Sequence, residues 1–494
     1  MINSTMSNFL QFTPPHIPEC ESGFEKKYSR LSSQEKEFFY VKRTIEMYPE
    51  IWKGYCELIE HEKWTPEQLA EYNFQQRKII VEWAYYNSPF YKKLYMDSGF
   101  EPNDLKTEED WNKLPCITKD MVRAHGNEMV VQSEMPFCEM RNTGGSTGKP
   151  LTIHSDKRLR ESAMISQWRC RGWWTGRPWG ELLDPKHAII GVDGVDFTRT
   201  DGIGNQDQAK VDLRKQLIWP RRSFTFDVTI MEDKEMMEYA QTLIDYFEDD
   251  SYYVCGYIGG IDAFCKWVIK HGIKLPRPIN ISTCASVLTA SIKQDIETAF
   301  GSLVFDDYCS NETVARVATD CLKSNGKHLH LCSDLYHVDV VDDYGHKLPA
   351  NVEGNVAVTV FKNQVQPLIK YMQGDRATYL GHICECGSPF PCISKIAGRE
   401  QQMVVDKYGN KLMMLSGVFD DYPNAVLRFQ YRTKGKGDVR MLYVPNKEYA
   451  NWQQECNTVF SYLKSIWGDR LDLSFEEVPE ISDDRGKIRF IVFE

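Results

Sequence analysis

Short stretches with strand character alternate with amphipathic helices between residues 188 and 306, and this alternation constrains the fold more than any other feature of the chain. Residues 188–192, 252–255 and 279–282 have the length and the apolar content of buried strands. Apolar side chains at helical spacing lie between them, most clearly over 231–247. Strands that alternate with helices in this way predict a layered α/β sheet.

The pattern changes beyond residue 330, where apolar and polar side chains alternate. Residues 336–341 and 354–360 flank a turn at 342–345, which predicts an antiparallel β unit. The last hundred residues contain a predicted hairpin over 403–415 and a predicted helix over 452–467. This end of the chain is therefore predicted to be α+β.

The length of the chain predicts more than one domain. At 494 residues it exceeds the size of one ordinary hydrophobic core. We assign residues 1–399 to a large α/β domain with layered sheets, helices and a β subdomain, and its first 130 residues are predicted to be helical. Residues 400–494 are assigned to a small C-terminal α+β domain.

Composition excludes several classes of partner. The net charge of −11 argues against a nucleic-acid or anionic-membrane surface, because a phosphate-rich surface requires a basic face. No apolar run approaches the roughly 20 residues of a membrane span. Residues 1–21 are polar and contain three prolines, which is not the pattern of a secretory signal. The fifteen cysteines are scattered, so reduced thiols or a metal site are expected rather than a disulfide framework, in a cytoplasmic protein.

A glycine-rich stretch at residues 143–150 carries the strongest chemical signal. It contains three glycines, three hydroxyl residues and one lysine, which together offer exposed backbone N–H groups, further donors and a cation to a polyphosphate. It is not a Walker A loop, because Thr143 stands where that motif has its first glycine and Pro150 replaces the metal-binding hydroxyl. The alternative is an ordinary surface turn. The candidate phosphate-binding residues are Thr143, Gly144, Gly145, Ser146, Thr147, Gly148 and Lys149.

Four later stretches are polar and compact. Residues 308–313 place an acid after a predicted strand, residues 371–376 place a carboxylate on a glycine turn, residues 398–400 precede the terminal domain, and residues 483–487 present a lysine on a turn. Each alone is typical of an ordinary turn. Their order along the chain is what carries information.

In that order the stretches resemble the motifs of the adenylate-forming enzymes, the superfamily that includes the acyl-CoA synthetases, and in particular those of its phenylacetate–CoA ligase and CapK-like branch. The resemblance covers the chain from about residue 75 to its end. The matching stretches are L-P-C-I-T-K at 114–119, T-G-G-S-T-G-K-P at 143–150, Y-C-S-N-E at 308–312, N-Q-V-Q-P-L-I-K-Y-M-Q-G-D at 363–375, G-R at 398–399 and G-K at 486–487.

The resemblance implies a nucleotide site. The glycine-rich loop would hold the β- and γ-phosphates of ATP, Glu312 would hold Mg²⁺, and Asp375 would accept hydrogen bonds from both ribose hydroxyls. Tyr308 would stack on adenine, and Arg399 would contact the ribose or a phosphate. The other implied nucleotide-binding residues are Ala285, Ser286, Asp307, Cys309 and Ser310.

The resemblance also implies the reaction. A carboxylic acid, aromatic or otherwise cyclic, would attack the α-phosphate of ATP, and Lys487 would neutralise the developing charge. The small domain would be mobile and would rotate after adenylation so that coenzyme A attacks the acyl-adenylate. An amine or a carrier-protein thiol as acceptor, a nucleotide-binding homologue without turnover, and a homodimer stay open. Without the resemblance, Lys487 would be interpreted as a solvated surface lysine.

The chain departs from the family pattern at several positions. Gln401 stands two positions past Arg399, where the family usually has an acidic residue. Cys284 and Ser286 stand in a segment that is commonly Gly-Ala-Glu or Gly-Ala-Pro, and Cys309 replaces the usual glycine after the tyrosine. Part of the nucleotide pocket and the hinge are therefore expected to be atypical.

A structural zinc site is the second chemical prediction. Cys384 and Cys386 form a C-x-C-G turn, and Cys321 and His328 lie upstream at positions where the branch also carries a cysteine and a histidine. Three thiolates and one imidazole would complete a tetrahedral shell. The alternative is a set of buried free cysteines. Residues close in sequence that could replace any of these ligands are His330, Cys332 and Cys392.

The acyl pocket is expected to lie between the glycine-rich loop and the adenine-binding residues. Tyr257, Ile258 and Gly259 follow a predicted strand end, where open α/β sheets place their ligands. The branch has a G-Y-P-S turn here, so the missing Pro-Ser pair predicts a changed pocket.

Overall fold

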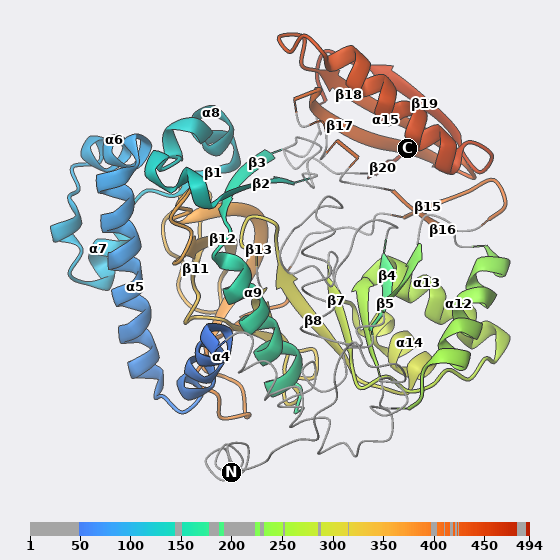
Figure 1. Ribbon diagram of the computed structural model, residues 1–494, viewed down its shortest axis with the longest axis horizontal. Helices are drawn as coiled ribbons and strands as arrows, with labels where there is room; N and C mark the ends of the chain where they lie inside the picture. The colour runs from blue at the N-terminus through green and yellow to red at the C-terminus, as the bar shows by residue number, and fades with distance from the viewer. Residues whose placement is uncertain are drawn as a thin grey trace.

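The computed structural model describes most of the chain and is shown in Figure 1. The described residues are 49–143, 151–176, 187–191, 223–227, 232–249, 252–284, 288–314, 316–396, 403–409, 411–414, 418–419, 422, 424–481 and 491–494.

Helices form the first part of the described chain, as predicted, and lie along one side of the molecule in Figure 1. The longest of them begins with a capping box, in which the Thr65 side chain accepts from the Gln68 N–H and the Gln68 side chain accepts from the Thr65 N–H. It ends at the predicted turn before Pro89. The helices are α4 (Pro49–His61), α5 (Pro66–Asn87), α6 (Pro89–Asp97), α7 (Glu108–Lys113) and α8 (Lys119–Met129), with 3-10 turns at Pro102–Asp104 and Gln132–Phe137.

The strands on either side of the glycine-rich stretch form an antiparallel pair. They are β2 (Cys138–Thr143) and β3 (Leu151–Asp156), and Thr143 lies opposite Leu151 at the end of the pair next to that stretch. Helix α9 (Leu159–Trp168) follows and continues into a π-helical turn at Arg169–Trp173.

A parallel sheet forms from the alternating region, with the order β8-β7-β6-β4-β5. Each strand pair in it is parallel because a helix returns the chain between most of the strands. Both α13 and α14 end at glycines in the left-handed conformation, Gly272 and Gly301. The elements are β4 (His187–Gly191), β5 (Ser223–Asp227), α12 (Asp233–Tyr246), β6 (Tyr253–Tyr257), α13 (Ile258–His271), β7 (Ile281–Cys284), α14 (Ala290–Phe300) and β8 (Val304–Cys309).

Strand β8 joins the parallel strands to the predicted antiparallel unit. It is parallel to β7 on one side and antiparallel to β9 on the other. The sheet continues from β8 in the order β9-β10-β14-β13-β12-β11. These strands are β9 (Arg316–Thr319), β10 (His328–Leu331), β11 (Tyr336–Val341), β12 (Glu353–Val360), β13 (Tyr371–Gly381) and β14 (Cys392–Ser394), and β1 (Ile117–Thr118) pairs with β13.

The C-terminal region is α+β, as predicted, and lies at the upper right of Figure 1. Its sheet has the order β19-β18-β17-β20 and packs against α15 through a hydrophobic cluster of its own. The predicted hairpin is the pair β15–β16, whereas the long pair β17–β18 was not anticipated. The elements are β15 (Met403–Val405), β16 (Lys411–Met413), β17 (Val426–Gly435), β18 (Asp438–Pro445), α15 (Trp452–Trp467), β19 (Asp472–Glu477) and β20 (Ile491–Phe493).

Three hydrophobic clusters of buried residues correspond to the N-terminal helices with the antiparallel strands, to the parallel layer, and to the C-terminal region. The predicted fold class, a large α/β domain followed by a small α+β domain, is confirmed. Among the described helices, none has both the length and the apolar character needed to cross a membrane.

Candidate functional site

The end of β8 and the turn that follows it form the first part of the candidate site. The Ser310 side chain accepts from the Thr313 N–H at 3.3 Å, and the Thr313 hydroxyl donates to the Ser310 carbonyl at 3.1 Å. Val314 leaves this turn with φ 68°, a conformation that a β-branched residue rarely adopts. The turn holds the Glu312 side chain in the interior, where it is only 4% exposed.

Alternate residues of β13 face this turn. Tyr371, Gln373 and Asp375 are buried, whereas Gly374 between them is exposed, as the two-residue period of a strand requires. The Tyr371 hydroxyl donates to Glu312 Oε1 at 3.2 Å. The Tyr308 hydroxyl lies 3.0 Å from Asp375 Oδ2. Two motifs some sixty residues apart in sequence are therefore brought into direct contact.

A third motif joins them through β1. Ile117 pairs with Tyr371 in a short parallel ladder, which places the next residues of the chain beside the turn after β8. Lys119 Nζ lies 3.7 Å from Glu312 Oε1, and both side chains are mostly buried. Sequence reasoning assigned no role to Lys119, Tyr371 or Gln373. The L-P-C-I-T-K resemblance was the only signal that could have pointed to Lys119.

The structure brings together four of the predicted nucleotide-binding residues, namely Tyr308, Ser310, Glu312 and Asp375. Asp307 is different, because it points into the sheet, where Arg316 Nε donates to its carboxylate at 2.6 Å and the Thr319 hydroxyl donates to it at 2.7 Å. Ser282 also contacts it. These contacts give Asp307 a structural role within the sheet.

Of the other predicted nucleotide contacts, Cys309 ends β8 and is partly buried, and most of the rest lie outside the described residues. Thr143 closes β2, although its side chain is not described. Those outside the described part are Gly144, Gly145, Ser146, Thr147, Gly148, Lys149, Ala285, Ser286, Arg399 and Lys487, and the hinge residue Gln401 lies there as well.

The predicted acyl-pocket residues lie at the same edge of the sheet. Tyr257 ends β6 opposite Cys284 at the end of β7, and Gly259 is buried in the first turn of α13. The Cys284 thiol donates to the Gly256 carbonyl at 3.6 Å and hydrogen-bonds the Cys309 thiol. Ile258 is fully buried and belongs to the hydrophobic core of the parallel layer, so its side chain packs inward.

Burial controls the protonation of the groups around β8. Burial, followed by the neighbouring carboxylate of Glu312, raises the pKa of the Tyr371 hydroxyl well above its usual value, so this hydroxyl stays protonated and can donate to Glu312. Burial also raises the pKa of Asp306, near the middle of β8, to about 7, although Lys395 opposes this effect.

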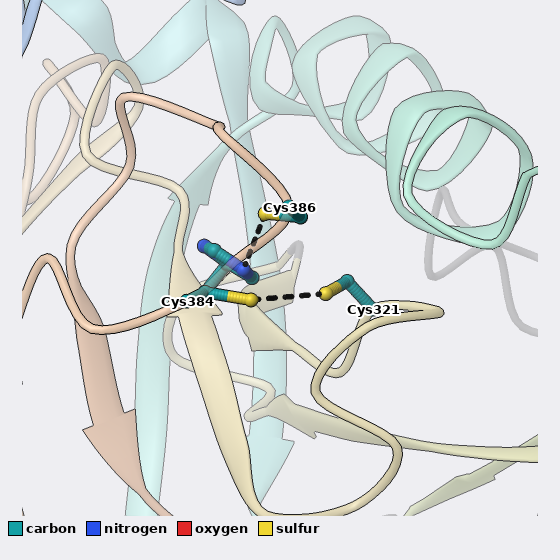
Figure 2. A group of neighbouring side chains, drawn as sticks. Cys321, Cys384 and Cys386 are labelled. Atoms are coloured by element: carbon teal, nitrogen blue, oxygen red, sulfur yellow. Dashed lines mark hydrogen bonds between the residues drawn. The ribbon is translucent and has the colours of Figure 1, made fainter.

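A second cluster contains three thiols and an imidazole, which Figure 2 shows gathered between two loops. The sulfur atoms of Cys321 and Cys384 are 3.6 Å apart, and Cys386 Sγ lies 3.4 Å from His330 Nε2. Zinc–ligand distances in a regular tetrahedron imply edges of about 3.8 Å between sulfurs and about 3.6 Å between sulfur and nitrogen. A disulfide would need sulfurs about 2.0 Å apart. The spacing therefore fits a tetrahedral metal shell.

Backbone groups orient these ligands in the way a metal site requires. Backbone N–H groups of Ser324 and Ser388 donate to the sulfurs of Cys321 and Cys386 at 3.2 and 3.4 Å. His330 Nδ1 lies 3.1 Å from the Phe390 carbonyl, which leaves Nε2 free to face the thiols. Hydrogen bonds from Cys321 and then from His330 lower the pKa of the Cys386 thiol to about 3, which favours the thiolate that binds metal.

The histidine of this cluster differs from the one predicted. Cys321, Cys384 and Cys386 lie together as expected, but their imidazole belongs to His330, whereas His328 forms a separate group with His330 and Cys392. The two histidines are two residues apart on β10 and therefore face the same side. The loop that carries the C-x-C-G turn passes His330.

Comparison with known proteins places this geometry in context. No family model matches the chain. The phenylacetate-coenzyme A ligase of Thermus thermophilus is 22% identical over 399 residues, which cover 76% of this chain and 80% of that protein. Protein CapK of Staphylococcus aureus is 22% identical over 345 residues, 68% of each chain.

The fold also matches solved structures of 2-hydroxyisobutyryl-CoA ligase. One, in complex with 2-HIB-AMP and CoA in the thioesterification state, has a TM-score of 0.58 at 15% identity and covers 88% of this chain and 91% of that chain. Another, in the postadenylation state with R3-HIB-AMP, has a TM-score of 0.54 at 14% identity, over 98% and 95% of the two chains. The fold is that of an adenylate-forming ligase.

The chain is therefore similar in sequence to phenylacetate-coenzyme A ligases and to protein CapK, and its fold is similar to that of adenylate-forming CoA ligases. The resemblance to the phenylacetate–CoA ligase and CapK branch is confirmed by the curated relatives. Two of these relatives are named phenylacetate-coenzyme A ligases, which is the enzyme class that the sequence predicts, an acid–thiol ligase.

Proposed function

We propose that this protein is an ATP-dependent, AMP-forming ligase that activates a carboxylic acid as its acyl-adenylate and transfers the acyl group to coenzyme A in the cytoplasm. The observation that carries the proposal is the convergence of Tyr308, Glu312 and Asp375, three side chains from two separate motifs, on one buried polar surface. Burying a charged carboxylate is costly unless the charge is paired or serves a function. Ordinary packing of a turn would therefore not favour a buried carboxylate on each of two neighbouring elements.

Each of these residues suits one part of ATP. An ionised Asp375 carboxylate offers two oxygens as acceptors and no donor, so it can hold both ribose hydroxyls while it also contacts Tyr308. The Tyr308 ring, which lies mostly buried at the end of β8, offers a stacking surface to adenine. The loop from Gly144 to Lys149 would bind the phosphates from its position between β2 and β3.

Glu312 fits the role of a magnesium ligand. Mg²⁺ is commonly bound through one or two carboxylates together with substrate phosphates, and Glu312 is a buried carboxylate. Lys119 and the Tyr371 hydroxyl contact the same Oε1 atom, so Glu312 is held in one orientation. When bound, Mg²⁺ would neutralise phosphate charge.

Lys487 is proposed to supply the last cation. We assign residues 400–494 to a mobile domain that delivers this lysine to the reacting carboxylate and α-phosphate. The separate hydrophobic cluster of the C-terminal region supports a unit that can move as a body. No protein nucleophile is needed, because the substrate carboxylate attacks phosphorus directly.

The acid is proposed to be aromatic or otherwise cyclic, on the resemblance to phenylacetate–CoA ligases and on the position of Tyr257 beside the nucleotide site. An amine or a carrier-protein thiol as acceptor, or nucleotide binding without turnover, is the alternative. The atypical residues Cys284 and Cys309, which face each other at the ends of neighbouring strands, motivate the alternative of nucleotide binding without turnover.

We also propose that Cys321, His330, Cys384 and Cys386 hold a structural Zn²⁺. The donor set, three sulfurs and one imidazole nitrogen, is typical of closed zinc sites. The metal would tie the loop after β9 to the loop that precedes β14 and would take no part in the reaction.

The decisive experiment is ATP–pyrophosphate exchange over a panel of aromatic, cyclic and aliphatic acids, followed by product analysis with coenzyme A, with amines, or with neither. Exchange with an aromatic acid and formation of its thioester are expected. Absence of exchange with every acid would favour nucleotide binding without turnover. If exchange occurs but only amines are acylated, the proposed acceptor is wrong.

A further inference from the structure

Gln373 connects the two ends of the candidate nucleotide site, although no motif drew attention to it. Its side chain is only 2% exposed and lies on β13 between Tyr371 and Asp375, on the same face. Its amide Nε2 donates to Ser310 Oγ at 2.8 Å, and its Oε1 accepts from the Tyr308 hydroxyl. One carboxamide therefore contacts the proposed adenine-binding residue and the turn that carries Glu312.

The Tyr308 hydroxyl has two acceptors but only one hydrogen. It lies within hydrogen-bonding distance of Gln373 Oε1 and of Asp375 Oδ2, which is 3.0 Å away. A phenol donates a single hydrogen bond, so the two acceptors compete for it. When ribose hydroxyls donate to Asp375, the Tyr308 hydrogen can turn fully to Gln373 without loss of a buried hydrogen bond.

The amide nitrogen of Gln373 contacts the turn that carries Glu312. Ser310 Oγ accepts from Gln373 and also from the Thr313 N–H, and this second bond closes the turn around Glu312. The position of Glu312 is therefore coupled to the same side chain that satisfies Tyr308.

We propose that Gln373 is a positioning residue of the nucleotide site, which keeps Asp375 available to the ribose by holding the Tyr308 hydroxyl and which orients the Glu312 turn through Ser310. This inference rests on the proposed function, because it takes Asp375 as the ribose acceptor. The ligand class it concerns is an adenosine nucleotide with its divalent cation.

The test replaces Gln373 by methionine, which has a similar length and removes both hydrogen bonds. AMP without Mg²⁺ isolates the ribose end, and its Kd is measured by calorimetry for the full-length chain. Gln373→Met should weaken AMP about 3- to 10-fold, the effect of one neutral hydrogen bond. In a Tyr308→Phe background, which lacks the hydroxyl, the same substitution should change the Kd less than about twofold.

The Glu312 end has its own readout. Gln373→Met should raise the Mg²⁺ concentration that gives half-maximal ATP–pyrophosphate exchange, and Ser310→Ala should raise it in the same direction. If Gln373→Met does not fold, Gln373→Asn takes its place. This variant retains the carboxamide but is one methylene shorter, so it can reach only one of the two partners. Its Kd for AMP should therefore rise less than the loss of both hydrogen bonds would raise it.

Asn73→Ala is the matched control, because Asn73 is another buried carboxamide and donates to the carbonyls of Ser333 and Tyr336 at 2.7 and 3.0 Å. It should lower the melting temperature while AMP affinity stays at the wild-type value.

The inference is overturned if Gln373→Met binds AMP as tightly as the wild type, or if it weakens AMP equally with and without the Tyr308 hydroxyl. Both outcomes require that the wild-type protein binds nucleotide, so they contradict the role of Gln373 and leave the proposed function standing. A wild-type protein that binds neither AMP nor ATP instead contradicts the proposed function itself.

Discussion

Replacement of Asp375 by asparagine tests the nucleotide assignment most directly. Asparagine has the same shape and keeps one oxygen as an acceptor for the Tyr308 hydroxyl, which lies 3.0 Å from the carboxylate in the wild type. Its amide NH₂ group replaces the second acceptor and the negative charge is lost. One charge-assisted hydrogen bond to a ribose hydroxyl, worth about 1.5–3 kcal/mol, should disappear. ATP affinity should therefore fall about 10- to 150-fold.

The assay compares two ligands on two proteins. The Kd values of ATP and of 2′,3′-dideoxy-ATP are measured by calorimetry for the wild type and for Asp375→Asn. The wild type should prefer ATP, and the variant should lose most of that preference, since the two ligands differ only in the hydroxyls that Asp375 is proposed to hold. Asp339→Asn is the control, because Asp339 is equally buried but accepts from Trp111 Nε1 in the antiparallel unit.

An unchanged preference for ATP in Asp375→Asn would refute the assignment, even if overall affinity dropped. A drop for both ligands by the same factor would mean that Asp375 supports the fold of the site and does not touch the ribose. Loss of discrimination in Asp339→Asn would show that the effect is a general consequence of removing a buried carboxylate.

Three further predictions concern the lysine, the metal and pH. Lys487→Ala should abolish ATP–pyrophosphate exchange while it leaves acyl transfer from a preformed adenylate largely intact, and an equal loss of both half-reactions would contradict the role. The purified protein should contain about one zinc per chain by elemental analysis; His330→Ala should lose it and His328→Ala should keep it, and the reverse result would exclude the proposed ligand set. Burial raises the Asp306 pKa to about 7 from its ordinary 3.8, so the folded state keeps a proton on Asp306 at pH values where the unfolded state has lost it. The free energy of unfolding therefore has its full contribution from Asp306 below about pH 4 and loses this contribution as pH rises toward 7. Asp306→Asn stays neutral, so denaturation midpoints should show it more stable than the wild type at pH 8, by at most about 4 kcal/mol, and nearly equal at pH 4. An unchanged difference between the two pH values would show that Asp306 does not titrate in this range.

Local sequence predicted part of the elements that carry the site. The strand before Tyr308 and the turn around Glu312 were recognised from short stretches, because strand periodicity and turn residues act over a few neighbours. The glycine turn expected at residues 371–376 was wrong, because Tyr371–Gly381 forms the strand β13. The order of these stretches then predicted the superfamily, which the comparisons support. The C-terminal pair β17–β18 was missed although apolar and polar side chains alternate along β17, as the strand period requires.

The contacts between motifs could not be predicted in the same way. Lys119 meets Glu312 only because β1 pairs with β13, and nothing near residue 117 specifies a partner more than 250 residues away. Gln373 was unremarkable in sequence, and its role depends on which face of β13 turns toward β8. The choice of His330 over His328 was equally undecided, since both point to the same side of β10.

The sequence by itself determined many of the strands, helices and turns, and which segments carry carboxylates, hydroxyls and thiols, because these properties depend on backbone preference and on residue chemistry within a short window. The tertiary structure alone decided which of those groups meet. Strand pairing across long separations set the distances between Tyr308, Glu312 and Asp375, and loop crossings selected the imidazole that faces the three thiols. Such pairings arise from the burial of whole faces and cannot be assigned to any single stretch of the chain.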